Sequence, residues 1–216
     1  MGVHIIPMSV LSALVNALFP AWCAVCAEHT AGGLICESCL GRRAEDIRSP
    51  AGLIGCRSLG LYSDGFGAAV RSAKYGRNLV LMDSLGVWLG RSIADWTGMS
   101  AEVVVSVPVP FGRKLMRGFD HGQRLAMGVS QATGIPHAAA LKCTGPVRQV
   151  GNSASHRRQL PRTAFDSRLA LDGKRVLLVD DVVTTGTTLS VAAEALRRGG
   201  AAMVWGLTVA HHECKE

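Results

Sequence analysis

Apolar runs and amphipathic stretches follow one another along most of the chain, a pattern typical of an α/β protein. Short apolar runs predict strands over residues 53–62, 101–107, 175–181 and 201–210. Apolar positions at helical spacing predict helices over residues 66–75, 79–96, 121–133 and 187–198. The last strand, helix and strand form one βαβ unit, which implies a parallel sheet with a right-handed crossover.

The first 48 residues carry a different pattern, in which an apolar stretch is followed by four cysteines. Prolines limit the predicted helix to residues 8–19, which at about 1.5 Å per residue would span roughly 18 Å, less than the ~30 Å core of a bilayer. A signal peptide would require a Lys or Arg before this stretch, and none is present. We therefore expect no membrane span and a cytoplasmic location. The turn formers at 49–52 predict a boundary between a segment of residues 1–48 and a domain of residues 53–212.

The composition adds a packed core and a positive charge to this picture. Of the 216 residues, 48% are hydrophobic and 18% are charged, which excludes a disordered chain. The net charge of +7 favours anionic partners such as nucleotides, phosphorylated sugars, nucleic acid or an anionic membrane. Aromatic residues make up only 5%, which argues against stacking on many bases of a single strand. The chain has no P-loop sequence, which excludes ATP hydrolysis by a P-loop, and it has no Gly-x-Ser-x-Gly elbow.

Four cysteines form two Cys-x-x-Cys pairs separated by nine residues: Cys23, Cys26, Cys36 and Cys39. Each pair can present two thiolates to one ion, so this spacing predicts a tetrahedral zinc site. Four sulfur ligands leave no position open for water, and the Zn²⁺ is therefore expected to be structural. Disulfides and free thiols are the alternatives, and His29 is an alternative fourth ligand.

The strongest candidate for chemistry is the predicted strand end with two adjacent carboxylates, Asp180 and Asp181. A turn follows them and opens a helix; it consists of Thr184, Thr185, Gly186, Thr187 and Thr188. The N–H groups at a helix N-terminus bind phosphate, and Gly186 allows a close approach of the backbone. Two acids beside it suit a diol or a hydrated Mg²⁺. One phosphate and one vicinal diol describe a ribose 5-phosphate group, whereas the alternative is a pair of acids that only cap the turn.

Residues 176–189 resemble the ribose-phosphate signature of the type I phosphoribosyltransferases, which bind 5-phosphoribosyl 1-pyrophosphate (PRPP). The rest of the chain is similar to one branch, the ComF (competence protein F) family. The segments that carry this resemblance are Leu18-Phe19-Pro20, Lys74-Tyr75, Val107-Pro108-Val109-Pro110, Arg117-Gly118-Phe119 and Gln149 through Arg157 to Phe165. Two places depart from the family's pattern outside the ribose-phosphate loop: Asp120-His121 stands for Asn-Gln, and Leu160 stands for an asparagine.

The resemblance implies a Rossmann-like type I phosphoribosyltransferase fold, with a mainly parallel sheet flanked by helices and a small N-terminal zinc knuckle made by the four cysteines. It implies that Asp180 and Asp181 are catalytic acids and that Val183 joins the loop 184–188 in binding PRPP. A pyrophosphate loop is implied for Pro108, Val109, Arg113, Lys114 and Arg117. A flexible loop over residues 146–162 would carry Arg148, Gln149 and Arg157. Without the resemblance, the proline-rich strand end at residues 107–110 could equally be a plain turn. Each arginine of the two loops could equally be a solvated surface charge.

Two functions follow from this resemblance. The first is a phosphoribosyltransferase that uses PRPP and Mg²⁺ and a nucleobase or similar nitrogen acceptor, in DNA uptake or nucleotide salvage. The second is a non-catalytic component of DNA uptake that binds single-stranded DNA or a helicase partner. Glycosyl transfer needs no protein nucleophile, so no catalytic base is predicted among His121, His137 and His156. The acceptor pocket is expected around Lys74 and Tyr75.

Overall fold

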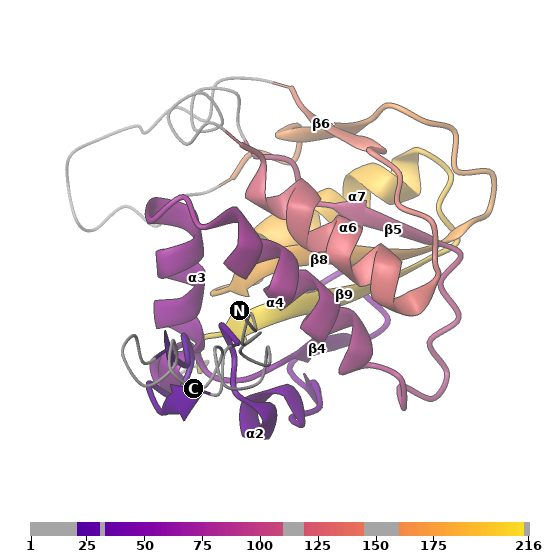
Figure 1. Cartoon of the computed structure of the whole chain (residues 1–216). Coiled ribbons are helices and arrows are strands. Elements are labelled where there is room, and N and C mark those ends of the chain that lie inside the picture. Colours follow the sequence, from indigo (N-terminus) through magenta and orange to yellow (C-terminus); the bar gives the residue numbers. More distant parts are fainter. Residues whose placement is uncertain (1–20, 31–32, 110–118, 145–159, 214–216) are drawn as a thin grey trace, which may run out of the picture.

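The computed structural model of the chain describes residues 21–30, 33–109, 119–144 and 160–213 (Figure 1). Its main sheet has five strands in the order β3 (Glu45–Asp46), β4 (Cys56–Ser58), β9 (Met203–His211), β8 (Arg175–Val183) and β5 (Val103–Ser106). Strands β4, β9, β8 and β5 run parallel, and the edge strand β3 pairs antiparallel with β4. The mainly parallel sheet expected from the sequence is confirmed.

Helices cover both faces of this sheet, as Figure 1 shows. On one face lie α3 (Gly67–Tyr75), α4 (Leu79–Arg91) and α6 (His121–Thr133), and on the other lies α7 (Thr187–Arg198). A hydrophobic core lies on each face of the sheet, and alternate residues of β8 contribute to one or the other. Leu177 and Val179 pack among residues of α4 and α6, whereas Val176 and Leu178 pack among residues of α7. The helices predicted over 121–133 and 187–198 have the expected bounds.

Three predicted elements are shorter than expected. The strand predicted over 53–62 is reduced to β4. An irregular turn, η1 (Tyr62–Phe66), follows it, and the backbone angles of its residues Asp64 and Gly65 are not helical. A side chain at Gly60 would collide with the ring of Phe66, so the chain can turn there only without a Cβ. The helix predicted over 79–96 ends at Arg91, where the Ser92 hydroxyl donates a hydrogen bond to the carbonyl of Leu89. The predicted strand 101–107 narrows to β5.

Several short elements were not predicted. Strand β1 (Ala21–Trp22) pairs with β2 (His29–Thr30), and the single turn α2 (Glu37–Leu40) carries Cys39. Strands β6 (Leu141–Cys143) and β7 (Phe165–Ser167) pair antiparallel beside α7. Most of the predicted loop 146–162, and the predicted helix 8–19, lie outside the described residues.

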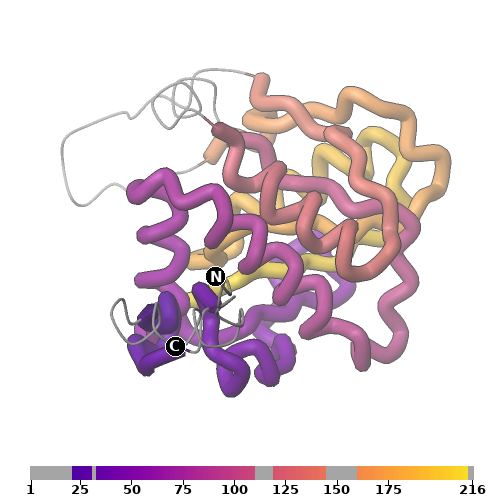
Figure 2. Tube along the Cα trace, in the orientation of Figure 1, coloured from indigo at the N-terminus to yellow at the C-terminus, as the bar shows by residue number. Residues whose placement is uncertain are grey.

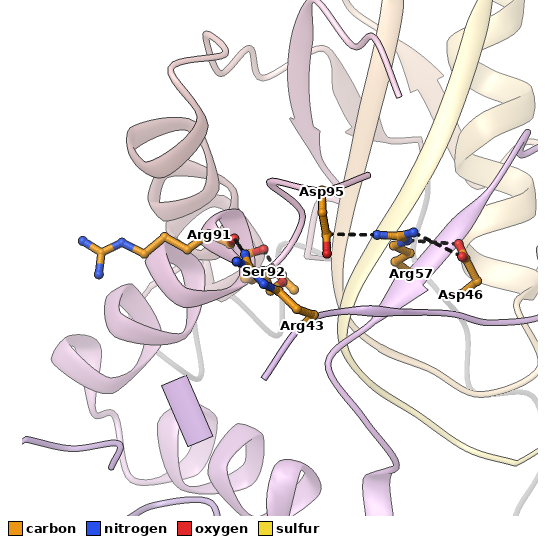
Figure 3. Close-up of polar contacts among 7 residues, drawn as sticks. Arg43, Asp46, Arg57, Arg91, Ser92 and Asp95 are labelled. Atoms are coloured by element: carbon orange, nitrogen blue, oxygen red, sulfur yellow. Dashed lines mark hydrogen bonds and ion pairs between the residues drawn. The ribbon is translucent and has the colours of Figure 1, made fainter. Parts of the chain in front are cut away.

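Polar contacts join the chain after the cysteines to the main domain (Figure 3). The Ala44 amide donates to the carbonyl of Ser92 over 3.2 Å, and Arg57 on β4 pairs with Asp46 at 3.0 Å and Asp95 at 3.4 Å. Residues 45–46, on the N-terminal side of the expected boundary, thus contribute a strand to the main sheet.

Apolar packing also attaches the cysteine segment, residues 21–40, to the helical layer. The buried Val25 and Ile35 belong to the same core as Phe66 and Trp88. Figures 1 and 2 both place the segment at one edge of the molecule, next to α3 and α4. In the described part of the chain, no helix has both the length and the apolar composition needed to cross a membrane.

Candidate functional site

The candidate site begins at the turn between β8 and α7. Gly186 forms the N-cap of α7 with a φ of +76°, in the left-handed region that glycine adopts without strain. A Cβ at this position would also lie 2.8 Å from the side chain of Pro50, which packs against the turn. Both the backbone angle and the packing therefore require glycine here.

Most backbone N–H groups of this turn have no acceptor in the described part of the chain; the amide of Thr187 donates to the Thr185 hydroxyl over 3.5 Å. Among the described residues, no acceptor takes the amides of Thr184, Thr185, Gly186 and Thr188. The amide of Ser190 is the first to make a helical bond, to the carbonyl of Gly186 over 2.9 Å. Free amides at the positive end of a helix dipole form a site for an anion.

A small pocket opens beside these amides. It encloses about 180 Å³ of empty space, part of it open to solvent, and its lining residues are Asp180, Val182, Val183, Thr184, Gly186, Thr188 and Leu189. The structure therefore brings Asp180 together with Val183 and with three residues of the predicted loop, Thr184, Gly186 and Thr188. The hydroxyls of Thr185 and Thr187, which do not line the pocket, lie 2.9 Å from each other.

Asp180 is the acid that faces this pocket. Its Oδ1 accepts a hydrogen bond from the Asp181 amide over 2.8 Å, and no cation of the described residues forms an ion pair with it. Burial, and then the negative charge of Asp181, raise the pKa of Asp180 to about 8. The site therefore holds a carboxyl that ionises readily only when a cation comes near.

Asp181 faces the opposite side of the sheet, where two side chains hold its Oδ2. The Lys74 Nζ on α3 donates to it over 2.6 Å, and the His121 Nε2 on α6 donates over 3.0 Å. All three side chains are at least 85% buried. Burial alone would raise the pKa of Asp181, but the Lys74 ammonium and the His121 hydrogen bond outweigh it and lower the pKa to about 2. This carboxylate ties α3 and α6 to the strand.

The two acids, which the sequence alone presents as one pair, thus have different surroundings. The alternation of side chains along a strand is the signal that separates them. His121, for which no role was predicted, contacts Asp181, and Lys74, expected in the acceptor pocket, reaches the same carboxylate. No sequence signal identifies these partners, because they come from helices distant in the chain.

A second, larger pocket lies on the other side of the end of β8. It has about 430 Å³ of empty space, part of it open to solvent, and its lining residues are Tyr62, Val70, Arg71, Lys74, Tyr75, Val182, Thr184 and His212. Val182 and Thr184 line both pockets. The two pockets are therefore neighbours that share one wall.

The remaining predicted site residues are only partly described. Pro108 and Val109 are half-buried directly after β5, and the Pro108 carbonyl accepts a hydrogen bond from the Cys143 thiol over 3.5 Å. Arg113, Lys114, Arg117, Arg148, Gln149 and Arg157 lie outside the described residues. Asp120, one of the departures from the family's pattern, caps α6 by accepting a hydrogen bond from the Gln123 amide over 3.0 Å.

The four cysteines of the N-terminal segment form one cluster, with all their sulfur atoms within 4.8 Å of one another. The Sγ atoms of Cys23 and Cys39 are 3.9 Å apart, and those of Cys26 and Cys36 are 3.5 Å apart. Four sulfurs at about 2.3 Å from a tetrahedral zinc ion would be roughly 3.8 Å apart, so the donor set fits. The pKa of the Cys36 thiol is lowered to about 6, and the largest cause is its hydrogen bond with the Ser38 hydroxyl. The cluster could hold a metal ion such as zinc.

Comparison with known proteins adds independent evidence. A family profile described as a phosphoribosyl transferase domain matches residues 138–216. The chain is 34% identical over 113 residues to Competence protein F of Haemophilus influenzae, an alignment that covers 49% of each protein. It is 34% identical over 103 residues to the DNA utilization protein YhgH of Escherichia coli K12, which covers 47% of this chain and 45% of that protein.

A third relative is the amidophosphoribosyltransferase of Synechocystis, 32% identical over 122 residues that cover 54% of this chain and 22% of that protein. The chain thus spans about half the length of the first two relatives and less of the third. The profile match and the mainly parallel sheet confirm the fold class expected from the sequence.

Proposed function

We propose that this chain is a member of the ComF family within the phosphoribosyltransferase superfamily, that it binds PRPP with Mg²⁺, and that it transfers the phosphoribosyl group to a nitrogen acceptor. The observation that carries this proposal is the turn 184–188, whose unpaired amides lie beside the carboxyl of Asp180. A phosphate monoester and the hydroxyls of one ribose match these donors and this acceptor. The name of the Synechocystis relative, an amidophosphoribosyltransferase, supports the same class of substrate.

In this proposal the protein acts by positioning. The amides of the turn hold the 5-phosphate, and Asp180 accepts hydrogen bonds from the ribose hydroxyls. The bond between C1 and the pyrophosphate oxygen breaks, and its electron pair leaves with pyrophosphate. The lone pair of the acceptor nitrogen forms the new bond to C1, and a proton on that nitrogen, where there is one, is released. No side chain is required as a nucleophile, because fixed geometry and the exclusion of water supply the rate.

Asp180 also fits a divalent cation, because its carboxyl has no ion pair among the described residues and its pKa is raised to about 8. When bound, Mg²⁺ would stabilise the negative charge of the departing pyrophosphate. Asp181 is a positioning residue in this proposal. It keeps Lys74 and His121 against the strand end, and through them it holds α3 beside the site.

Replacing Gly186 by alanine should weaken PRPP binding at least about tenfold, as measured by calorimetry with Mg²⁺ present. A Cβ there meets Pro50 and disfavours the positive φ, so the amides would turn away from the anion. Gly173→Ala is the matched control, because Gly173 has a φ of +78° and a Cβ there would meet nothing within 4 Å. Equal PRPP affinity in the two variants would contradict the proposed role of the turn.

We also propose that the cysteine cluster binds one structural Zn²⁺. When bound, the ion would cross-link residues 23–39 and hold them against η1, where the carbonyl of Val25 lies so close to Gly65 that no side chain fits. A zinc assay of the purified chain should give one ion per molecule. Cys39→Ser should lose this ion and lower the melting temperature, whereas Cys143→Ser, outside the cluster, should retain it. Metal content unaffected by Cys39→Ser would refute the site.

A second candidate function is a part in handling DNA, favoured by the names of two relatives, Competence protein F and DNA utilization protein YhgH. In this case the chain would bind single-stranded DNA or a helicase partner, with or without the transferase reaction. Its net charge of +7 suits an affinity that falls as salt rises. Fluorescence anisotropy with a labelled oligonucleotide tests this, and no binding at low salt would remove direct contact with DNA. The cytoplasmic location stays a prediction.

A further inference from the structure

The larger pocket is lined by both tyrosines of the chain, Tyr62 and Tyr75, and by one histidine, His212. The ring of Tyr62 stacks on that of His212, with centroids 4.4 Å apart and planes inclined by 22°. Tyr75 is 70% exposed. In a chain with few aromatic residues, this grouping provides flat surfaces on which a planar ring can stack.

The pocket also carries a guanidinium that no acid of the described fold neutralises. The Arg71 Cζ lies 5.2 Å from the centroid of the Tyr62 ring, and within the described ranges Arg71 has no carboxylate partner. The other cation of the lining, Lys74, already pairs with Asp181 at 2.6 Å. The charge that is left to a ligand is therefore that of Arg71, which lies over the ring of Tyr62.

We infer that this pocket receives a planar, nitrogen-containing ring that bears a carboxylate, and that this compound is the acceptor. The inference rests on the proposed function and deepens it by naming the class of acceptor. A ring would stack on the exposed ring of Tyr75, and its carboxylate would take two parallel hydrogen bonds from the Arg71 guanidinium. A neutral base of the same size would leave the Arg71 charge without a partner.

The size and place of the pocket agree with a single ring. The volume that a ligand could fill, about 170 Å³, lies below the roughly 300 to 1,000 Å³ of drug-sized sites, so the pocket suits a ligand no larger than a single ring. Because Val182 and Thr184 form a wall of both pockets, a ring there lies next to the proposed ribose site. In a pyridine ring the nitrogen lone pair would bond to C1 as pyrophosphate leaves with the electrons of the C1–O bond, and no proton is lost.

Calorimetry on the full chain, with Mg²⁺ and ribose 5-phosphate present, tests the inference with two probes of the same shape: pyridine-3-carboxylate and its neutral amide, pyridine-3-carboxamide. We expect the carboxylate to bind about tenfold more tightly, since a charge-assisted bidentate contact is lost in the amide. Arg71→Gln should abolish this preference. Arg91→Gln, which removes the same charge from an exposed side chain at the end of α4, should retain it (Figure 3).

The two proposals can fail separately. If ribose 5-phosphate binds but the carboxylate has no advantage over the amide, or keeps it in Arg71→Gln, the inference is overturned and the proposed function stands. If the carboxylate binds in an Arg71-dependent way while ribose 5-phosphate and PRPP do not bind, the pocket is upheld and the proposed function is overturned. A third outcome is that the pocket binds the carboxylate and the amide with equal affinity and that an oligothymidylate displaces both. This would assign the pocket to a nucleic-acid strand and overturn the inference.

Discussion

Replacing Asp181 by asparagine should lower the free energy of unfolding by about 3 kcal/mol, because it removes one partner of a buried ion pair. The Lys74 ammonium, 2.6 Å from the carboxylate and 85% buried, would lose its counter-charge, and His121 would lose a charged acceptor. Denaturant unfolding at neutral pH measures this loss. The folded pKa of Asp181 is lowered from 3.8 to about 2, so the stabilisation is complete above about pH 4 and is lost as the pH falls towards 2.

Two further variants test this explanation. Asp166→Asn breaks an ion pair with Lys142 at 3.3 Å in which both side chains are more than 40% exposed, and it should cost less than about 1 kcal/mol. Adding Lys74→Met to Asp181→Asn should restore most of the lost stability, because the unpaired ammonium is then absent. Equal losses in Asp181→Asn and Asp166→Asn would show that the buried pair does not hold the two helices.

Replacing Asp180 by asparagine should have the opposite effect on stability, a gain of about 2 kcal/mol at neutral pH, while it weakens PRPP binding at least about tenfold. The pKa of Asp180 is raised from 3.8 to about 8. At pH 7, about three pH units above the ordinary pKa of 3.8, the Asp180 carboxyl is ionised in the unfolded chain and must take up a proton when the chain folds. At roughly 1.4 kcal/mol per pH unit, this opposes folding by up to about 4 kcal/mol. Burial of the asparagine amide still has a cost, so we expect about half of this gain.

The pH dependence separates this explanation from a general packing effect. A carboxyl with a raised pKa stabilises the fold fully below about pH 4, and this stabilisation is lost as the pH rises towards 8. Asparagine does not titrate, so the advantage of Asp180→Asn should be small at pH 4 and increase up to about pH 8. Thermal melts across this range measure the difference. An advantage independent of pH, or unchanged PRPP affinity, would contradict the role given to Asp180.

The long elements could be predicted because their boundaries are encoded locally. Residues 121–133 begin after the capping side chain of Asp120 and end at Gly134, which has a φ of +74°. Residues 187–198 likewise begin after Gly186. Short elements carry no such signal. Strands β6 and β7 have three residues each, and each becomes a strand only because it pairs with the other, which is distant in the sequence. The early end of the strand predicted over 53–62 depends on Phe66, a contact outside that run.

The candidate site divides in the same way. The turn 184–188 and the four cysteines are contiguous or regularly spaced, so their residue types already indicate their chemistry. The difference between Asp180 and Asp181 depends on Lys74 from α3 and His121 from α6, which only the packed helices bring to the strand. The grouping of Arg71 with the Tyr62–His212 stack could not be predicted either, because it forms only where α3, η1 and the residue after β9 come together.

The proposed function depends above all on the amides of the turn between β8 and α7, which would bind the phosphate of a phosphorylated ribose. Amide NMR spectra of the full chain, recorded during titration first with ribose 5-phosphate and then with PRPP and Mg²⁺, observe these groups individually. We expect the resonances of Thr184, Thr185, Gly186 and Thr188 to shift most in both titrations. Binding of PRPP that leaves these four resonances in place, and shifts those of another part of the chain, would refute the proposed phosphate site.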